Sequence, residues 1–188
     1  MRWQQLFADL SAQWEEADAA AERVESASRA RAEVGGVLLA DRLRGAVGAR
    51  VVLRCRGAGQ VAGAVTDVGP DWILLGAERG AEALVAAAAV LSVTGLGRVT
   101  APPAEGAVRA GPDLRRAVRG LARDRSQVQV VLVDGALITG TIDRVGADFF
   151  EIAAHALDEA RRGSAVQGVT AVALTALAVV RTAVPGLD

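Results

Sequence analysis

The side chains that most often carry catalytic chemistry are scarce in this chain. His155 is the only histidine and Cys55 the only cysteine among 188 residues. One histidine gives no basis for a His-based zinc site or a Ser-His-Asp triad, and one cysteine excludes an internal disulfide. His155 falls in a predicted surface loop, whereas Cys55 alternates with Leu53 and Val51 and is expected in the core. We therefore predict a protein that is not an enzyme and that holds no cofactor or metal.

Two other patterns imitate functional motifs, and each has a simpler structural explanation. Asp71 and Asp148 invite a paired-carboxylate hypothesis, but each lies between a Gly-containing turn and an aromatic residue. Aspartate favours such places because its side chain bonds to the local backbone. Residues 57–63 carry three glycines in the manner of a dinucleotide-binding loop, which needs a helix directly after the glycines. The residues that follow have the pattern of a strand, so we predict no such site.

Arginine is abundant and unevenly placed along the chain. All 21 of the Lys and Arg residues are arginine, although the formal net charge is −1. Residues 41–56 and residues 98–125 each carry a net charge of +4, and the remaining segments are acidic. Because arginine neutralises phosphates and releases their counterions, these two segments predict binding of RNA or DNA. The candidate residues are Arg42, Arg44, Arg54, Arg56, Arg115, Arg116, Arg119 and Arg123.

A simpler explanation of the same arginines stays open. Lys, Asn and Tyr are absent, as expected of a GC-rich genome, so codon supply accounts for part of the arginine excess. On this explanation, the arginines form solvated helix faces and pair with the acidic N-terminal segment.

The N-terminal segment, residues 1–36, is predicted to be a long amphipathic helix and a possible coiled coil. It contains no Pro or Gly before Gly35, and its apolar residues are spaced alternately by four and three positions. The seam is made by Trp3, Phe7, Leu10 and Trp14. A stripe of this size is expected to contact a second copy of the chain or a protein partner.

The rest of the chain contains a pattern that occurs twice. Residues 51–93 alternate like strands and are divided by Gly-rich turns. A shift of 77 positions places Gly63 on Gly140 and Trp72 on Phe149, and the second copy then has ten additional residues in one loop. We therefore predict one repeat over residues 37–97, a linker over 98–113 and a second repeat over 114–183.

The second copy resembles the Sm-like fold, a five-stranded bent barrel behind an N-terminal helix. The resemblance is carried by Val130–Gly135 and by Ile138, Gly140 and Ile142. It implies an α+β, mainly β protein: two small Sm-like bent β-barrels in tandem, preceded by the long amphipathic helix. The opening residues 3–7 are also similar to those of an uncharacterised family of actinobacterial proteins.

The Sm-like family implies RNA binding, but its RNA-contacting residues are not reproduced here. Gly69 and Gly146 stand where the family usually has Asp, and Ile73 and Phe150 stand where it has Asn. The nucleotide pocket of the family is therefore not expected in this chain, and any binding would depend on the arginines.

Two functional hypotheses follow. The first is a non-enzymatic protein that binds the RNA or DNA backbone through the two arginine segments, in a regulatory or nucleic-acid-associated role. The second is an interaction scaffold that self-associates through the N-terminal helix or through barrel edges. The longest apolar runs, 83–93 and 169–180, are 11 and 12 residues, too short to span a bilayer. We therefore expect a cytoplasmic protein without a membrane partner.

Overall fold

The computed structural model describes residues 13, 14, 16, 18–26, 28, 32, 34–76, 80–101, 111–155 and 168–182. The chain divides into two compact units, Met1–Leu38 and Leu39–Asp188. Each unit is described by itself.

Within the described residues, the N-terminal unit shows no unbroken helix of the length predicted for residues 1–36. Its continuous helical stretch within the described residues covers 18–26. The side chains along it are exposed, with Val24 at 68% of its full accessibility, and so is Trp14, which precedes it, at 72%. Helices are stabilised in proteins mainly by packing of an apolar face, and the stretch 18–26 offers mostly alanine as apolar residues, which buries little area. The prediction of a long amphipathic helix is therefore wrong.

The second unit begins with a first half, residues 39–94, that consists of a short helix and five strands. The strands alternate between buried and exposed residues, as the period of two predicts: β1 buries Val51, Leu53 and Cys55 on one face. The elements are α2 (Leu39–Arg44), β1 (Arg50–Cys55), β2 (Gly59–Val68), β3 (Trp72–Gly76), β4 (Glu82–Ala86), the 3-10 turn η2 (Ala87–Ala89) and β5 (Val90–Thr94).

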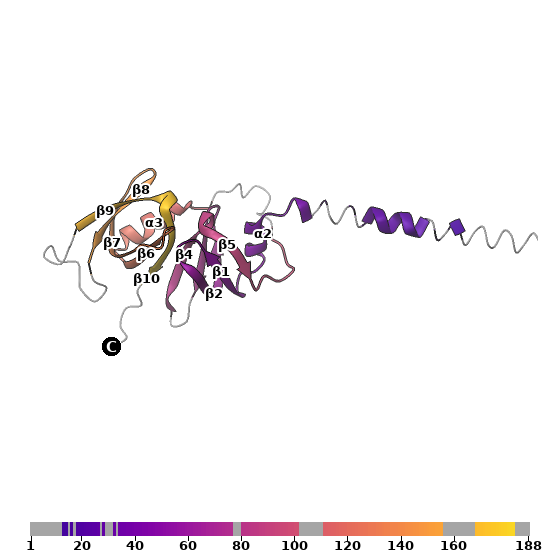
Figure 1. Cartoon of the computed structure of the whole chain (residues 1–188), viewed down its shortest axis with the longest axis horizontal. Helices are drawn as coiled ribbons and strands as arrows, with labels where there is room; N and C mark the ends of the chain where they lie inside the picture. The colour runs from indigo at the N-terminus through magenta and orange to yellow at the C-terminus, as the bar shows by residue number, and fades with distance from the viewer. Residues whose placement is uncertain are drawn as a thin grey trace, which may run out of the picture. The chain divides into compact units, whose positions relative to one another are not determined.

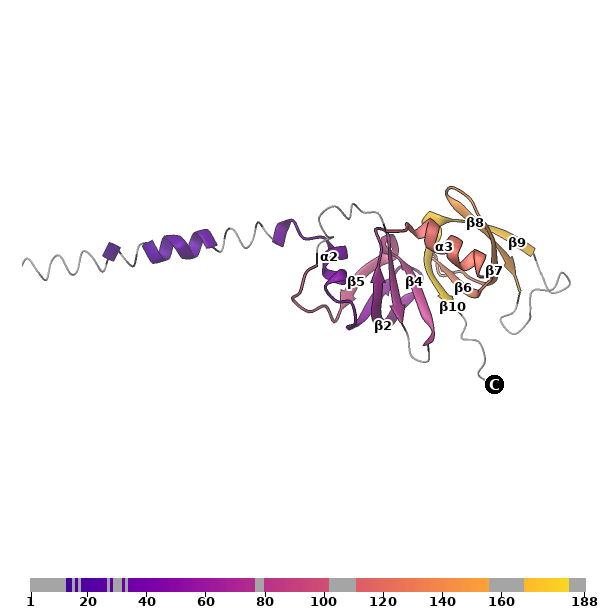
Figure 2. The same ribbon diagram turned by 180° about the vertical axis from the view of Figure 1, so that it is seen from behind.

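The second half, residues 114–182, has the same order of elements. It consists of α3 (Leu114–Arg123), β6 (Gln127–Leu132), β7 (Leu137–Val145), β8 (Phe149–Ala154), β9 (Gly168–Ala173), the 3-10 turn η3 (Leu174–Ala176) and β10 (Leu177–Thr182). Helix α3 buries Leu114 and Val118 and packs on β7. In both views the strands of this half curve past α3 (Figures 1 and 2).

The two halves form one continuous antiparallel sheet rather than two separate barrels. The order of its ten strands is β5-β1-β2-β3-β4-β10-β6-β7-β8-β9. The halves join where β4 pairs with β10, with Val85 opposite Val179 and Leu84 opposite Val180. Because the residues on these two edges are apolar, pairing the edges buries them together and satisfies their backbone groups. The predicted fold class of two tandem Sm-like barrels is therefore wrong.

The strands of the second half pair in the same register as those of the first half when residue numbers are shifted by 77. Val51 is opposite Gly63 in the first half, and Val128 is opposite Gly140 in the second. The two glycines allow neighbouring strands to approach closely. A Cβ on Gly63 would lie 2.6 Å from Gly76 O, and one on Gly140 would overlap with Ala153 O. Glycine is thus required at these two strand positions by a steric contact with the neighbouring strand.

Candidate functional site

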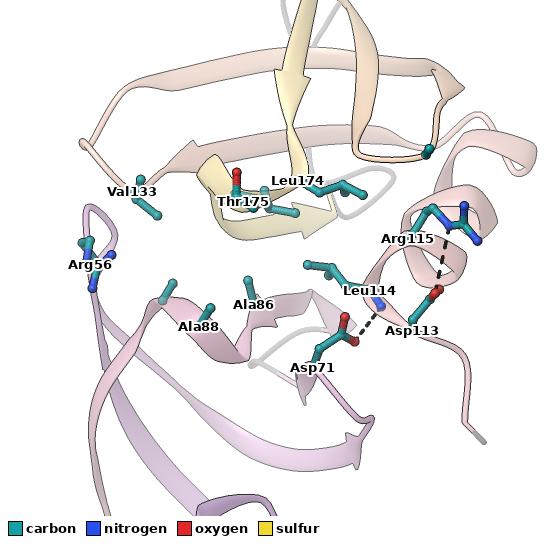
Figure 3. Close-up of a pocket in the computed structure, with 13 residues that line it drawn as sticks. Arg56, Asp71, Ala86, Ala88, Asp113, Leu114, Arg115, Val133, Leu174 and Thr175 are labelled. Atoms are coloured by element: carbon teal, nitrogen blue, oxygen red, sulfur yellow. Dashed lines mark hydrogen bonds and ion pairs between the residues drawn. The ribbon is translucent and has the colours of Figure 1, made fainter. Parts of the chain in front are cut away.

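A cleft of about 400 Å³ lies between the two halves of the sheet. It is bounded by η2 on one side and by η3 and the start of α3 on the other, as Figure 3 shows. The residues of η2 that line it are Ala88 and Ala89, so one wall is made of small apolar side chains. The polar lining comes from two arginines, two aspartates and Thr175.

Helix α3 brings Arg115 into this cleft. Asp113 is the N-cap residue, and its carboxylate accepts a hydrogen bond from Arg116 N at 2.8 Å. Asp71, from the first half, accepts one from Leu114 N at 2.7 Å. Both carboxylates thus satisfy backbone N–H groups at the helix start, where the helix dipole favours negative charge. Arg115 Nε lies 4.0 Å from Asp113 Oδ2, and its side chain is 33% exposed.

Arg56 lies at the other end of the cleft from Arg115 (Figure 3). It follows β1 directly and precedes a turn in which Gly57 has φ of +71°. Its backbone N–H donates to Ala89 O at 2.8 Å, which ties this turn to η2. Arg56 is exposed. Both aspartates of the lining stand near Arg115, so the Arg56 end carries the unbalanced positive charge.

The remaining arginines of the first basic segment are not brought to the cleft. Arg42 donates a hydrogen bond to Gly97 O, and its Nε is buried without a partner among the described residues. Arg44 forms a 2.6 Å ion pair with Asp41. Arg54 is exposed on β1 and does not line the cleft. The four candidate arginines of this segment are thus divided into two that contact their own half, Arg42 and Arg44, and two that are exposed, Arg54 and Arg56.

In the second segment, the other three candidate arginines lie on the outer side of α3. Arg116, Arg119 and Arg123 are exposed and are spaced by three and four positions, which places them along one helix face. Two of their contacts are long: Arg119 Nη2 is 3.5 Å from Val145 O, and Arg123 Nε is 3.9 Å from Asp124 Oδ1. This arginine face continues from the helix turn that holds Arg115. The pairing of these arginines with the acidic N-terminal segment stays a prediction.

The two residues with distinctive side-chain chemistry are both buried. Cys55 is in the core as predicted, and burial raises the pKa of its thiol, an effect that Arg181 partly opposes. His155 was expected on the surface, and this is wrong: it is 3% exposed, and its Nε2 lies 2.8 Å from Thr141 Oγ1. Its partner comes from the neighbouring strand β7, which no local sequence pattern reveals.

One structural role was not predicted from the sequence. Asp71 was expected to bond to its own turn, but its carboxylate instead caps α3, which starts 43 residues later. The neighbouring Trp72 makes a similar contact, because its Nε1 donates to Pro112 O at 2.6 Å. The predicted N-terminal seam is described only at Trp14. Trp3, Phe7 and Leu10 lie outside the described residues.

Comparisons with known proteins identify no relative of this chain. No family model, curated protein or solved structure matches the chain. Within the described ranges, no three His, Cys, Asp or Glu side chains gather as ligands for a metal ion. None of the described helices has the length and apolarity needed to cross a membrane.

Proposed function

We propose that this chain binds the sugar-phosphate backbone of RNA or DNA along the cleft between the two sheet halves. The observation that carries the proposal is that Arg56 and Arg115, one from each basic segment of the sequence, line the same cleft. These two segments were identified by net charge alone. A phosphate chain that enters beside Arg56 would continue past Arg115 to the exposed arginine face of α3.

The walls of the cleft favour backbone contact over recognition of bases. Ala86, Ala88 and Ala89 offer no hydrogen-bonding side chain, and the Thr175 hydroxyl is a small donor suited to a phosphate oxygen. Arginines that contact phosphates set the position of a nucleic acid without reading its sequence. We therefore expect binding with little sequence preference and with a steep dependence on salt.

The test is a salt titration of binding to a fluorescent single-stranded RNA and to a duplex DNA. Each neutralised phosphate contributes about 0.9 to the slope of log affinity against log salt for duplex DNA. The double variant Arg56→Gln, Arg115→Gln is expected to weaken binding and to lower the absolute slope by about two. Arg54→Gln is the matched control, because Arg54 is exposed on the same strand yet does not line the cleft.

Two outcomes contradict the proposal. The first is a wild-type protein that binds neither nucleic acid at low salt. The second is an Arg54→Gln variant that weakens binding as much as Arg56→Gln does, since binding would then follow total charge and not the cleft. Circular dichroism of each variant verifies that the sheet is intact.

A further inference from the structure

A second groove, of about 250 Å³, lies where α3 faces the strands that join the two halves. One side of it is formed by β3, β4 and β10, and the other side is formed by α3. The apolar members of its lining are Trp72, Leu74, Leu84, Ala117, Leu121 and Val180. The groove and the arginine cleft share no lining residue, so the two sites are separate.

Small residues on α3 keep this groove open. Ala117 and Gly120 are three positions apart, which places them next to each other along the helix. A Cβ on Gly120 would meet no atom within 4 Å, so there is unfilled space beside it. Across from the helix, Leu84 and Val180 are 7% and 1% exposed, and they lie opposite each other at the β4–β10 junction. The groove therefore has a fixed apolar floor and room above it.

The charged residues of the groove's lining are both acids, Glu82 and Asp124. Glu82 starts β4 and is exposed. Among the residues that the structure describes, its carboxylate forms no ion pair. Asp124 is the C-cap residue of α3, and its contact with Arg123 is long, at 3.9 Å, between two exposed side chains. Such a contact offsets little charge, so the lining of the groove is negative.

The end of α3 favours a bound cation as well. The negative end of a helix dipole lies at the C-terminus of the helix and stabilises positive charge there. α3 ends at Arg123, one residue before Asp124. Thr182 also lines the groove, and its Oγ1 contacts the backbone of Glu82 at 3.3 Å and 3.4 Å. Carboxylate and hydroxyl oxygens of this kind accept hydrogen bonds from an ammonium group.

We propose that this groove binds a small organic cation, made of one ammonium group on a compact apolar body. The apolar body packs against Trp72 and Leu84, and the ammonium group binds at Glu82 and Asp124. An ammonium group donates three hydrogen bonds, which matches two carboxylates and the hydroxyl of Thr182. The ligand is small, because the volume of the groove is below the range of about 300–1,000 Å³ that is usual for drug-sized ligands.

The charges of the two sites select different ligands. In the proposed function, Arg56 and Arg115 attract phosphate, whereas the carboxylates of the groove repel it. The cation proposal does not rest on nucleic-acid binding, since no residue is common to both sites. Loss of nucleic-acid binding in an arginine variant therefore leaves the cation proposal intact, and the reverse also holds.

The first experiment compares phenethylamine with phenethyl alcohol, which has the same apolar body and no charge. Trp72 lines the groove and reports binding by fluorescence when the other two tryptophans, Trp3 and Trp14, are replaced by Phe. Saturable binding of the amine is expected at millimolar concentration, with about tenfold weaker binding of the alcohol. Added salt should weaken binding of the amine only, because it screens exposed charges.

The second experiment removes the two carboxylates at nearly constant size. The double variant Glu82→Gln, Asp124→Asn is expected to bind the amine about tenfold more weakly and to bind the alcohol as before. Its matched control is Glu16→Gln, Glu22→Gln, which removes the same charge from exposed residues outside the groove and should keep the preference for the amine. Ala117→Leu fills the groove and should weaken binding of both probes.

Four results overturn the cation proposal. Neither probe gives a saturable change, or the amine and the alcohol bind equally well. The preference for the amine persists in the Glu82→Gln, Asp124→Asn variant, or a folded Ala117→Leu variant binds both probes as the parent chain does. Circular dichroism verifies that each variant keeps its sheet, and the carboxylate variant decides the question if Ala117→Leu does not fold.

Discussion

The two halves of the sheet share one register and differ in what covers them. Trp72 and Asp71 of the first half contact the second half, through Pro112 and the start of α3. Their counterparts Phe149 and Asp148, at the same positions of the second repeat, are exposed. Local strand structure is thus the same with or without a neighbour, because it depends on pairing within each half. Burial of the outer residues depends on which edge receives another strand.

The cores of the halves also differ in how they are filled. At one equivalent position the second half has Phe150 and the first half has Ile73, with exposures of 0% and 2%. The second half additionally buries the hydrogen-bonded pair of His155 and Thr141. At the position of Phe150 and Ile73, the second half is therefore filled by an aromatic ring and the first half by an aliphatic side chain.

The largest expected effect tests this difference in core filling. Phe150→Ala is expected to lower the free energy of unfolding by about 3–5 kcal/mol, because it removes a ring that has no exposed area and leaves a cavity. Ile73→Val removes one methylene at the matching position and should cost about 0.5–1.5 kcal/mol. Urea denaturation followed by tryptophan fluorescence measures both. Equal losses would show that the two cores are packed alike.

The next effect concerns the close approach of strands at the two equivalent glycines. Gly140→Ala should destabilise by about 1–3 kcal/mol, because the new Cβ overlaps with a backbone oxygen of the neighbouring strand. Gly63→Ala should cost less, since its Cβ would lie 2.6 Å from Gly76 O and the overlap is milder. Gly120→Ala in α3 is the control. Its Cβ meets nothing within 4 Å, and alanine favours a helix, so thermal unfolding should move upward.

A smaller effect separates the two equivalent aspartates. Asp71→Ala removes the side-chain acceptor of Leu114 N and should cost about 0.5–2 kcal/mol, the usual range for loss of a helix cap. Asp148→Ala changes an exposed residue and should stay within about 0.5 kcal/mol of the wild type. Thermal unfolding of the two variants side by side gives the difference. Equal stability of the two variants would show that the Asp71 cap does not stabilise the junction between the halves.

The smallest effect is a pH dependence confined to the first half. Burial raises the pKa of the Cys55 thiol above its ordinary value of 9.0, and Arg181 partly opposes this. Below pH 9 the thiol is neutral in both states, and stability is unaffected. As pH rises from 9.0 through the folded pKa, the unfolded thiol ionises first, so stability is lost.

The composition of the chain makes this pH effect measurable. It contains no Lys and no Tyr, so no other kind of side chain titrates in that range. Denaturation of wild type and Cys55→Val at several alkaline pH values is the test. The wild type should lose stability relative to the variant as pH rises, and parallel curves would contradict this account.

Sequence patterns located the strands of each half well. The period-two residues of β1 and the turn at Gly69 are where the structure has them, because alternation and turn chemistry are local properties. The same local argument failed for the N-terminal segment. A heptad spacing shows only which face would pack, and the long helix does not follow from it, since no partner is specified by the spacing.

The candidate site was predicted only as two charged segments. Net charge along the sequence identified both segments. The structure then separates the four candidate arginines of the first: Arg42 and Arg44 contact their own half, and of the four only Arg56 lines the cleft. Which arginine remains exposed depends on contacts such as Gly97 O, 55 residues away from Arg42. No pattern within the segment contains that information.

The sequence by itself determined the repeated strands, the glycines at their bends and the burial of Cys55, because alternation, turns and side-chain size act over a few residues. Only the tertiary structure decided that β4 and β10 join the halves into one sheet, that Asp71 caps a helix of the other half, and that His155 is buried against Thr141. The physical reason is that edge pairing and capping join groups far apart in sequence, and their free energy appears only when both partners are in place.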